Sequence, residues 1–138
     1  MKFTYYEFPV NVSPSSQNKK LLYRPIVPII FIGKKKIIGY EALIDSGSDF
    51  NVFDAGIADV LGVNLTSGHK RQILGIGAQK LKGYEHIIDI RVAGKKYETK
   101  IIFSRHIPPN SYGILGQQGF FDNFEVKFDY RKKYIEVI

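Results

Sequence analysis

One short motif in this chain of 138 residues has the residue types needed for acid–base chemistry. Asp45 follows the apolar segment 42–44 and is followed by Ser46, Gly47 and Ser48. A carboxylate at the end of a strand has a rigid support, and a glycine leaves room for a ligand to approach the backbone. The same residue types also form ordinary β-turns, so the motif alone is a weak indication of a site.

Two other segments give that motif a context. Segment 112–121 contains a short apolar strand that ends at Gly116 and continues into polar and then aromatic residues. Segment 72–80 has the pattern of a hairpin whose tip consists of Gly75, Ile76 and Gly77. A flexible, apolar tip of this kind would suit a lid over a cleft.

The elements that must position these segments are mostly strands. Apolar and polar residues alternate in several segments, as in a sheet with one buried face. Strands are predicted over residues 21–32, 37–44, 69–76, 81–93, 96–104, 124–130 and 134–138. A short helix is predicted over 55–61, because Asp54 can cap it and Gly62 can end it. The predicted fold class is all-β, mainly antiparallel, with one or two short helices. In segment 124–130, Phe124, Val126, Phe128 and Tyr130 are expected to share one face.

The chain is predicted to divide at residue 20. Residues 1–20 form an N-terminal extension with a weak strand pattern and a polar loop, and residues 21–138 form one domain.

Composition excludes several kinds of site. Cysteine is absent, which excludes disulfides, thiolate zinc sites, iron–sulfur clusters and a cysteine nucleophile. His69, His86 and His106 are far apart in sequence, so no metal site is expected. No cofactor is expected either. No segment is long and apolar enough to cross a bilayer, and the first residues lack an apolar signal core. We therefore expect a cytoplasmic protein without a membrane partner.

The chain is basic, with 20 Lys+Arg against 13 Asp+Glu and a formal net charge of +7. Its lysine and arginine clusters fall in expected turns between strands, where solvated hairpin tips explain them. No nucleic-acid recognition motif accompanies the charge, so no nucleic-acid partner is expected. A basic β-domain that binds nucleic acid stays a distant alternative, which salt-sensitive binding would reveal.

Taken together, the three segments resemble the retropepsin-like aspartic proteases of the single-domain, bacterial or cellular type. Residues 43–49, with the apolar pair 52–53, match the family's Asp-Ser/Thr-Gly signature. Ile114, Leu115 and Gly116 match its second element, two aliphatic residues and a glycine. The resemblance covers about residues 37–138 and implies an acid-protease-like half-barrel.

The resemblance implies hydrolysis of peptide bonds by two aspartates that share a water molecule. Two close carboxylates cannot both ionise, so one keeps a proton while the other accepts one. Because the chain has a single Asp-Ser-Gly motif, the second aspartate must be Asp45 of another copy. A homodimer acting on a peptide or protein substrate is therefore expected.

The resemblance also assigns roles to individual residues. Asp45 would be the catalytic acid and base, Ser46 would bond across the two-fold axis, and Gly47 would place its backbone beside the carboxylates. Ser48 is expected to donate a hydrogen bond to Asp45 and to favour an acidic optimum. The residues expected to bind substrate are Ser48, Asp49, Gly75, Ile76, Gly77 and Ile114.

One departure from the family pattern leaves a second interpretation open. Viral members often have an arginine directly after the second glycine, where it braces the aspartate that corresponds to Asp49. Gln117 occupies that position here, which puts the brace and the usual dimer contacts in doubt. The alternative is a retropepsin-like fold retained as a dimerisation or peptide-binding module with weak or no activity.

Overall fold

A computed structural model describes residues 1–15 and 17–138, and within them the strands form three sheets. The elements, in chain order, are β1 (Lys2–Thr4), β2 (Tyr6–Asn11), β3 (Lys19–Arg24), β4 (Ile26–Ile32), β5 (Ile37–Ile44), β6 (Val52–Asp54), α1 (Ala55–Leu61), the 3-10 turn η1 (Leu65–Ser67), β7 (His69–Leu74), β8 (Lys80–Val92), β9 (Lys95–Ser104), β10 (Gly113–Leu115), β11 (Val126–Asp129) and β12 (Tyr134–Val137). The predicted all-β, mainly antiparallel class with a short helix is confirmed.

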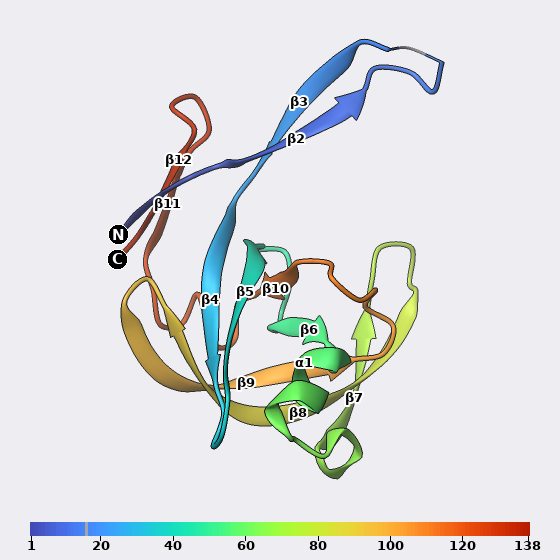
Figure 1. Ribbon diagram of the computed structural model, residues 1–138, viewed down its shortest axis with the longest axis vertical. Helices are drawn as coiled ribbons and strands as arrows, with labels where there is room; N and C mark the ends of the chain where they lie inside the picture. Colours follow the sequence, from blue (N-terminus) through green and yellow to red (C-terminus); the bar gives the residue numbers. More distant parts are fainter. Residues whose placement is uncertain (16) are drawn as a thin grey trace.

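The largest sheet closes on itself. Its strand order is β4-β5-β10-β6-β9-β8-β7, and β4 also pairs with β8, so only β7 lies outside the closed ring (Figure 1). The β5–β10 and β6–β9 pairs are parallel, and the other pairs are antiparallel. Phe31, Phe53 and Phe103 are fully buried in the core, with the Phe31 and Phe53 rings edge to face at a centroid distance of 4.9 Å.

Helix α1 begins and ends as the sequence predicts. The Asp54 carboxylate accepts a hydrogen bond from the Gly56 amide at 3.1 Å, which satisfies one of the unpaired N–H groups of the first turn. Gly62 ends the helix with a φ of 75°, a left-handed conformation that glycine adopts without steric cost. No helix among the described residues is long and apolar enough to cross a membrane.

The two ends of the chain meet in a small sheet with the order β1-β12-β11. The Met1 amino group donates to the Val137 carbonyl at 2.6 Å, and the Val137 amide donates back to the Met1 carbonyl at 2.9 Å. Phe128 and Tyr130 are 42% and 56% exposed, so the shared aromatic face predicted for this segment is buried only in part. β11 lies at the edge of its sheet, with a pairing partner on one side only.

The third sheet is a two-stranded ribbon of β2 and β3, which extends away from the closed sheet (Figure 1). The division expected at residue 20 falls inside β3. Pro25 separates β3 from β4, so the predicted strand over 21–32 belongs to two sheets. We call the ribbon formed by β2 and β3 the N-terminal arm.

Burial of Tyr97 predicts a loss of stability in alkaline solution. Desolvation, followed by the negative charge of Asp122, raises the pKa of Tyr97 above its ordinary value of 10.0, while the hydroxyl donates to the Gly119 carbonyl at 2.9 Å. Above about pH 10 the unfolded chain releases this proton and the folded chain keeps it, so the free energy of unfolding falls as pH rises. Denaturant titrations at a series of pH values should show a shallower alkaline decline for Tyr97→Phe. An equal decline in both proteins would contradict this cause.

Candidate active site

Asp45 lies where two parallel strands end side by side. Ile44, the last residue of β5, pairs with Leu115, the last residue of β10. The Asp45 amide then donates to the Leu115 carbonyl at 3.0 Å. This bond places Asp45 next to Gly116, so the two apolar strand ends noted in the sequence are neighbours in the fold.

The carboxylate of Asp45 is held by its own loop. Its Oδ1 atom accepts a hydrogen bond from the Gly47 amide at 2.9 Å, and its backbone carbonyl accepts one from the Ser48 amide at 3.1 Å. Asp45 is half-buried, whereas Ser46 and Gly47 are exposed. The loop therefore fixes the carboxylate with backbone groups and presents it at the surface, where a second molecule can reach it.

Ser48 differs from expectation. Its hydroxyl donates to the Phe50 carbonyl at 2.9 Å instead of to Asp45. The physical reason is that the tight turn already provides the Gly47 amide as a donor to the carboxylate, while the Phe50 carbonyl lies within reach of Ser48. The predicted Ser48–Asp45 hydrogen bond is therefore wrong for this structure.

A buried asparagine joins the Asp45 loop to β10. The Asn51 side chain is 1% exposed; its Oδ1 atom accepts from the Gly116 amide at 2.9 Å, and its Nδ2 atom donates to the Lys100 carbonyl at 3.3 Å. Gly116 approaches the loop so closely that a Cβ atom there would lie 2.4 Å from the Phe50 carbonyl oxygen. Sequence reasoning gave Asn51 no role. Its one available signal was a polar residue directly before the buried pair Val52 and Phe53.

Gln117 also braces the loop, although only its departure from the family pattern was evident in the sequence. Its side-chain amide donates to the Ser46 carbonyl at 2.6 Å, and its backbone amide donates to the Ser48 carbonyl at 2.8 Å. The Gln118 amide donates to the Asp49 carbonyl at 2.9 Å. A row of hydrogen bonds thus joins segment 116–118 to segment 46–51.

The other predicted site residues lie in two places. Asp49 is an exposed residue of the same loop, and Ile114 is half-buried in β10 opposite Leu43. Gly75, Ile76 and Gly77 form the exposed tip of the β7–β8 hairpin, where Ile76 is fully exposed. The tip rises at the same end of the closed sheet as the end of β5 (Figure 1). No hydrogen bond or ion pair described for this chain joins the tip to Asp45.

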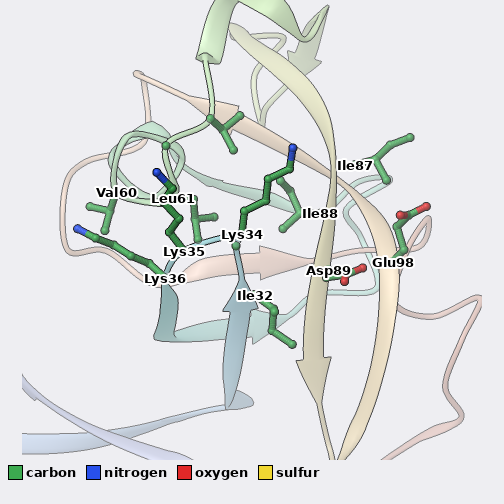
Figure 2. Close-up of a pocket in the computed structure, with 13 residues that line it drawn as sticks. Ile32, Lys34, Lys35, Lys36, Val60, Leu61, Ile87, Ile88, Asp89 and Glu98 are labelled. Carbon is green, nitrogen blue, oxygen red and sulfur yellow. The ribbon is translucent and has the colours of Figure 1, made fainter.

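One cavity of the structure is distant from this loop. It has a volume of about 800 Å³ and lies between the end of α1, the β4–β5 turn and strands β8 and β9 (Figure 2). Val60 and Leu61 form part of its apolar lining, and three lysines of the turn stand at its rim. The turn precedes β5 and Asp45 follows it, so the length of the strand, about 26 Å, separates them. None of the predicted site residues lines this cavity.

Histidine and carboxylate side chains are the metal ligands that this chain could offer, since it has no cysteine. Within residues 1–15 and 17–138, no three His, Asp or Glu side chains come together in a group that could hold a metal ion. Instead, the His86 ring contacts the Leu65 carbonyl at 2.8 Å.

Similarity to known proteins is found among solved structures. No family model and no curated protein sequence matches the chain. Among solved structures, it is similar to an EIAV protease complexed with the inhibitor HBY-793, with 21% sequence identity and a TM-score of 0.48. The similarity covers 77% of this chain and 88% of that chain. The function therefore has to be inferred from the residues of the site themselves.

The Asn51 contact predicts a loss of stability when the side chain is shortened. In Asn51→Ala the buried Gly116 amide loses its acceptor, which should lower the free energy of unfolding by about 1–3 kcal/mol. Denaturant unfolding would measure the change. Asn123→Ala, at an exposed side chain, is the matched control and should change it by less than about 0.5 kcal/mol. Equal losses in the two variants would rule out a special role for Asn51.

Proposed function

We propose that the chain is an aspartic endopeptidase that works as a homodimer with one Asp45 from each copy. The observation that carries the proposal is the mounting of Asp45. Its carboxylate is held by the Gly47 amide in a surface loop that hydrogen bonds fasten to the end of β10. A rigid, reachable carboxylate suits catalysis, and the retropepsin-like signature around it gives the reaction class.

A second carboxylate is a chemical requirement of this proposal. Peptide hydrolysis needs a base to activate water and an acid to polarise the carbonyl group, and one carboxyl group cannot be both at once. Two Asp45 side chains across a two-fold axis would meet the requirement, because close carboxylates share one proton. The exposed Ser46 and Gly47 would lie beside that axis, with Ser46 bonding to the other copy.

The proposed reaction adds water to the peptide carbonyl group and then breaks the carbon–nitrogen bond. The ionised Asp45 removes a proton from water while the oxygen of that water bonds to the carbonyl carbon of the substrate. The protonated Asp45 gives its proton to the carbonyl oxygen, which forms a neutral gem-diol. The Asp45 that took the proton from water then gives it to the leaving nitrogen, while the other Asp45, now ionised, removes a proton from a hydroxyl of the gem-diol. The carbon–nitrogen bond breaks, a carboxylic acid and an amine remain, and the pair of aspartates again shares one proton.

The other predicted residues would hold the substrate. Exposed Asp49 would accept hydrogen bonds from substrate amides, while Ser48 and Ile114 would lie at the wall of the binding cleft. The hairpin tip of Gly75, Ile76 and Gly77 would close over the bound peptide. Full exposure of Ile76 supports this role, since an aliphatic side chain without a partner gains by covering a ligand.

Gln117 favours a second candidate function. Its side chain donates to the Ser46 carbonyl at 2.6 Å, so it braces the loop backbone; the family's arginine would brace the aspartate at Asp49. A loop braced in this different way would also serve a peptide-binding or dimerisation module with weak or no activity. The two candidates differ in whether the bound peptide is cut.

Replacement of Asp45 tests the proposed function directly. Asp45→Asn keeps the shape of the side chain but removes the proton exchange, so cleavage of a mixed peptide library should fall by at least about 10²-fold. The library is assayed from about pH 3 to about pH 8, because a shared proton gives a bell-shaped profile. A statine-type transition-state mimic should block the wild-type cleavage.

Asp89→Asn provides the matched control. The Asp89 side chain is 40% exposed, and its carboxylate pairs with Lys96 at 3.3 Å. The pair lies close to the turn between β8 and β9. Its replacement should leave cleavage unchanged. A folded wild-type dimer that cuts no peptide at any pH would contradict the endopeptidase and leave the binding module.

Ser48 gives a second test, which concerns the pH profile. The Ser48 hydroxyl bonds to the Phe50 carbonyl and not to Asp45. Ser48→Ala should therefore leave the pH of maximum activity unchanged and lower the free energy of unfolding by about 1 kcal/mol. Initial rates across the pH range, together with denaturant unfolding, would measure both effects. A displaced optimum would mean that the hydroxyl reaches Asp45 in the active dimer.

A further inference from the structure

The N-terminal arm is a ribbon with one apolar face. Residues opposite each other in an antiparallel pair lie on the same face. Tyr6 pairs with Arg24, Phe8 with Leu22, and Val10 with Lys20, so these side chains share a face. We call it the apolar arm face, since Tyr6, Phe8, Val10 and Leu22 dominate it. Tyr6 is 46% exposed and Leu22 is 37% exposed.

The root of the arm is fixed on both of its faces. On the apolar arm face, the Arg24 guanidinium lies over the Phe8 ring at 4.8 Å and donates to the Tyr112 hydroxyl. On the opposite face, the Tyr23 ring lies 6.4 Å from that of Tyr130, and the Lys133 ammonium lies 4.4 Å from the Tyr23 ring. These contacts aim the arm in one direction, so it is a positioned element and not a loose tail.

Beyond its root, the arm has little of its own chain to cover it. Strands β2 and β3 pack mainly against each other. A two-stranded ribbon is marginally stable in water by itself, and a positioned apolar face commonly marks an interaction site. The apolar arm face contacts Tyr112, directly before β10. The far end of β10, about 10 Å along that strand, lies beside Asp45. The arm extends from the end of the closed sheet at which β5 ends (Figure 1).

We propose that the apolar arm face is a dimerisation surface that packs against a second copy of this chain and so brings the two Asp45 loops together. This inference rests on the proposed function, in which the site is incomplete without the other copy. The terminal strands are already used within one copy, because β12 pairs with β1 on one side and β11 on the other. Among the described residues, β2 and β3 form strand pairs only with each other.

The size and charge of the arm agree with this occupant. Six residues per strand give a face about 20 Å long and about 10 Å wide, or about 200 Å². Each copy would bury its own arm face and an equal area that receives the arm of the other copy, about 400 Å² in all. A stable dimer buries roughly 800 Å² of each partner, so the Asp45 loops would have to supply the remaining area. Two chains of charge +7 repel each other, so apolar contact must drive association. Added salt should therefore strengthen the dimer.

Two neighbouring leucines provide a matched test. Leu22 lies on the apolar arm face, and Leu21, which pairs with Pro9, lies on the opposite face with 44% exposure. Leu22→Asp should raise the dimer dissociation constant at least about tenfold, because it buries a charge in the interface, whereas Leu21→Asp should change it less than about threefold. Sedimentation over a range of concentrations measures association, and peptide cleavage is measured in the same samples.

A second variant guards against local misfolding of the ribbon. Residues 8–22 are replaced by a short Gly-Ser linker, which leaves β1 and the closed sheet in place, and circular dichroism checks the fold. A monomer in this variant beside a wild-type dimer supports the proposal, whether or not the wild type cuts peptides. Dimers in all the variants would overturn the role of the arm while leaving the endopeptidase intact. A wild-type chain that stays monomeric at every concentration would overturn both.

Discussion

The buried hydrogen bond from the Gly116 amide to the Asn51 side chain joins the end of β10 to the loop that carries Asp45, and the candidate site depends on this contact. It forms where the loop after β5 passes so close to β10 that no side chain fits at Gly116. Gln117 and Gln118 extend the contact with bonds to loop carbonyls. The position of the loop that carries Asp45 is therefore set by the backbone of a closed sheet. A substrate or a second copy would bind to a carboxylate that is already held in place.

Local patterns in the sequence predicted most of the elements, because each depends on neighbouring residues. Alternation of apolar and polar residues identified β8, in which Ile88, Ile90 and Val92 are buried. Asp54 and Gly62 identified both ends of α1, since caps are local contacts. The position of Asp45 at the end of β5 followed from the same reasoning. The roles assigned to the site residues stay predictions.

Contacts between distant residues could not be predicted in this way. The pairing of β1 with β12 joins the two ends of the chain, and no local pattern encodes it. The alternation over 124–130 was real, but burial depends on what packs against the strand, and Phe128 lies at an edge. Ser48 lies close to both Asp45 and Phe50 in sequence, so only the geometry of the turn decides which oxygen its hydroxyl meets.

The length of β8 limits how the β7–β8 hairpin can move. β8 pairs with β9 from Tyr84 onward, whereas from Lys80 to Gly83 its pairing partner is β7, outside the closed ring. A Cβ atom at Gly83 would lie 2.4 Å from the Ile102 side chain. β8 is therefore packed closely against β9 at the point where the part of β8 that pairs only with β7 begins. The hairpin is therefore fixed at its base and free at its tip, so any displacement is largest near Ile76. Bending at the base would strain β8, the same strand that closes the ring around the core.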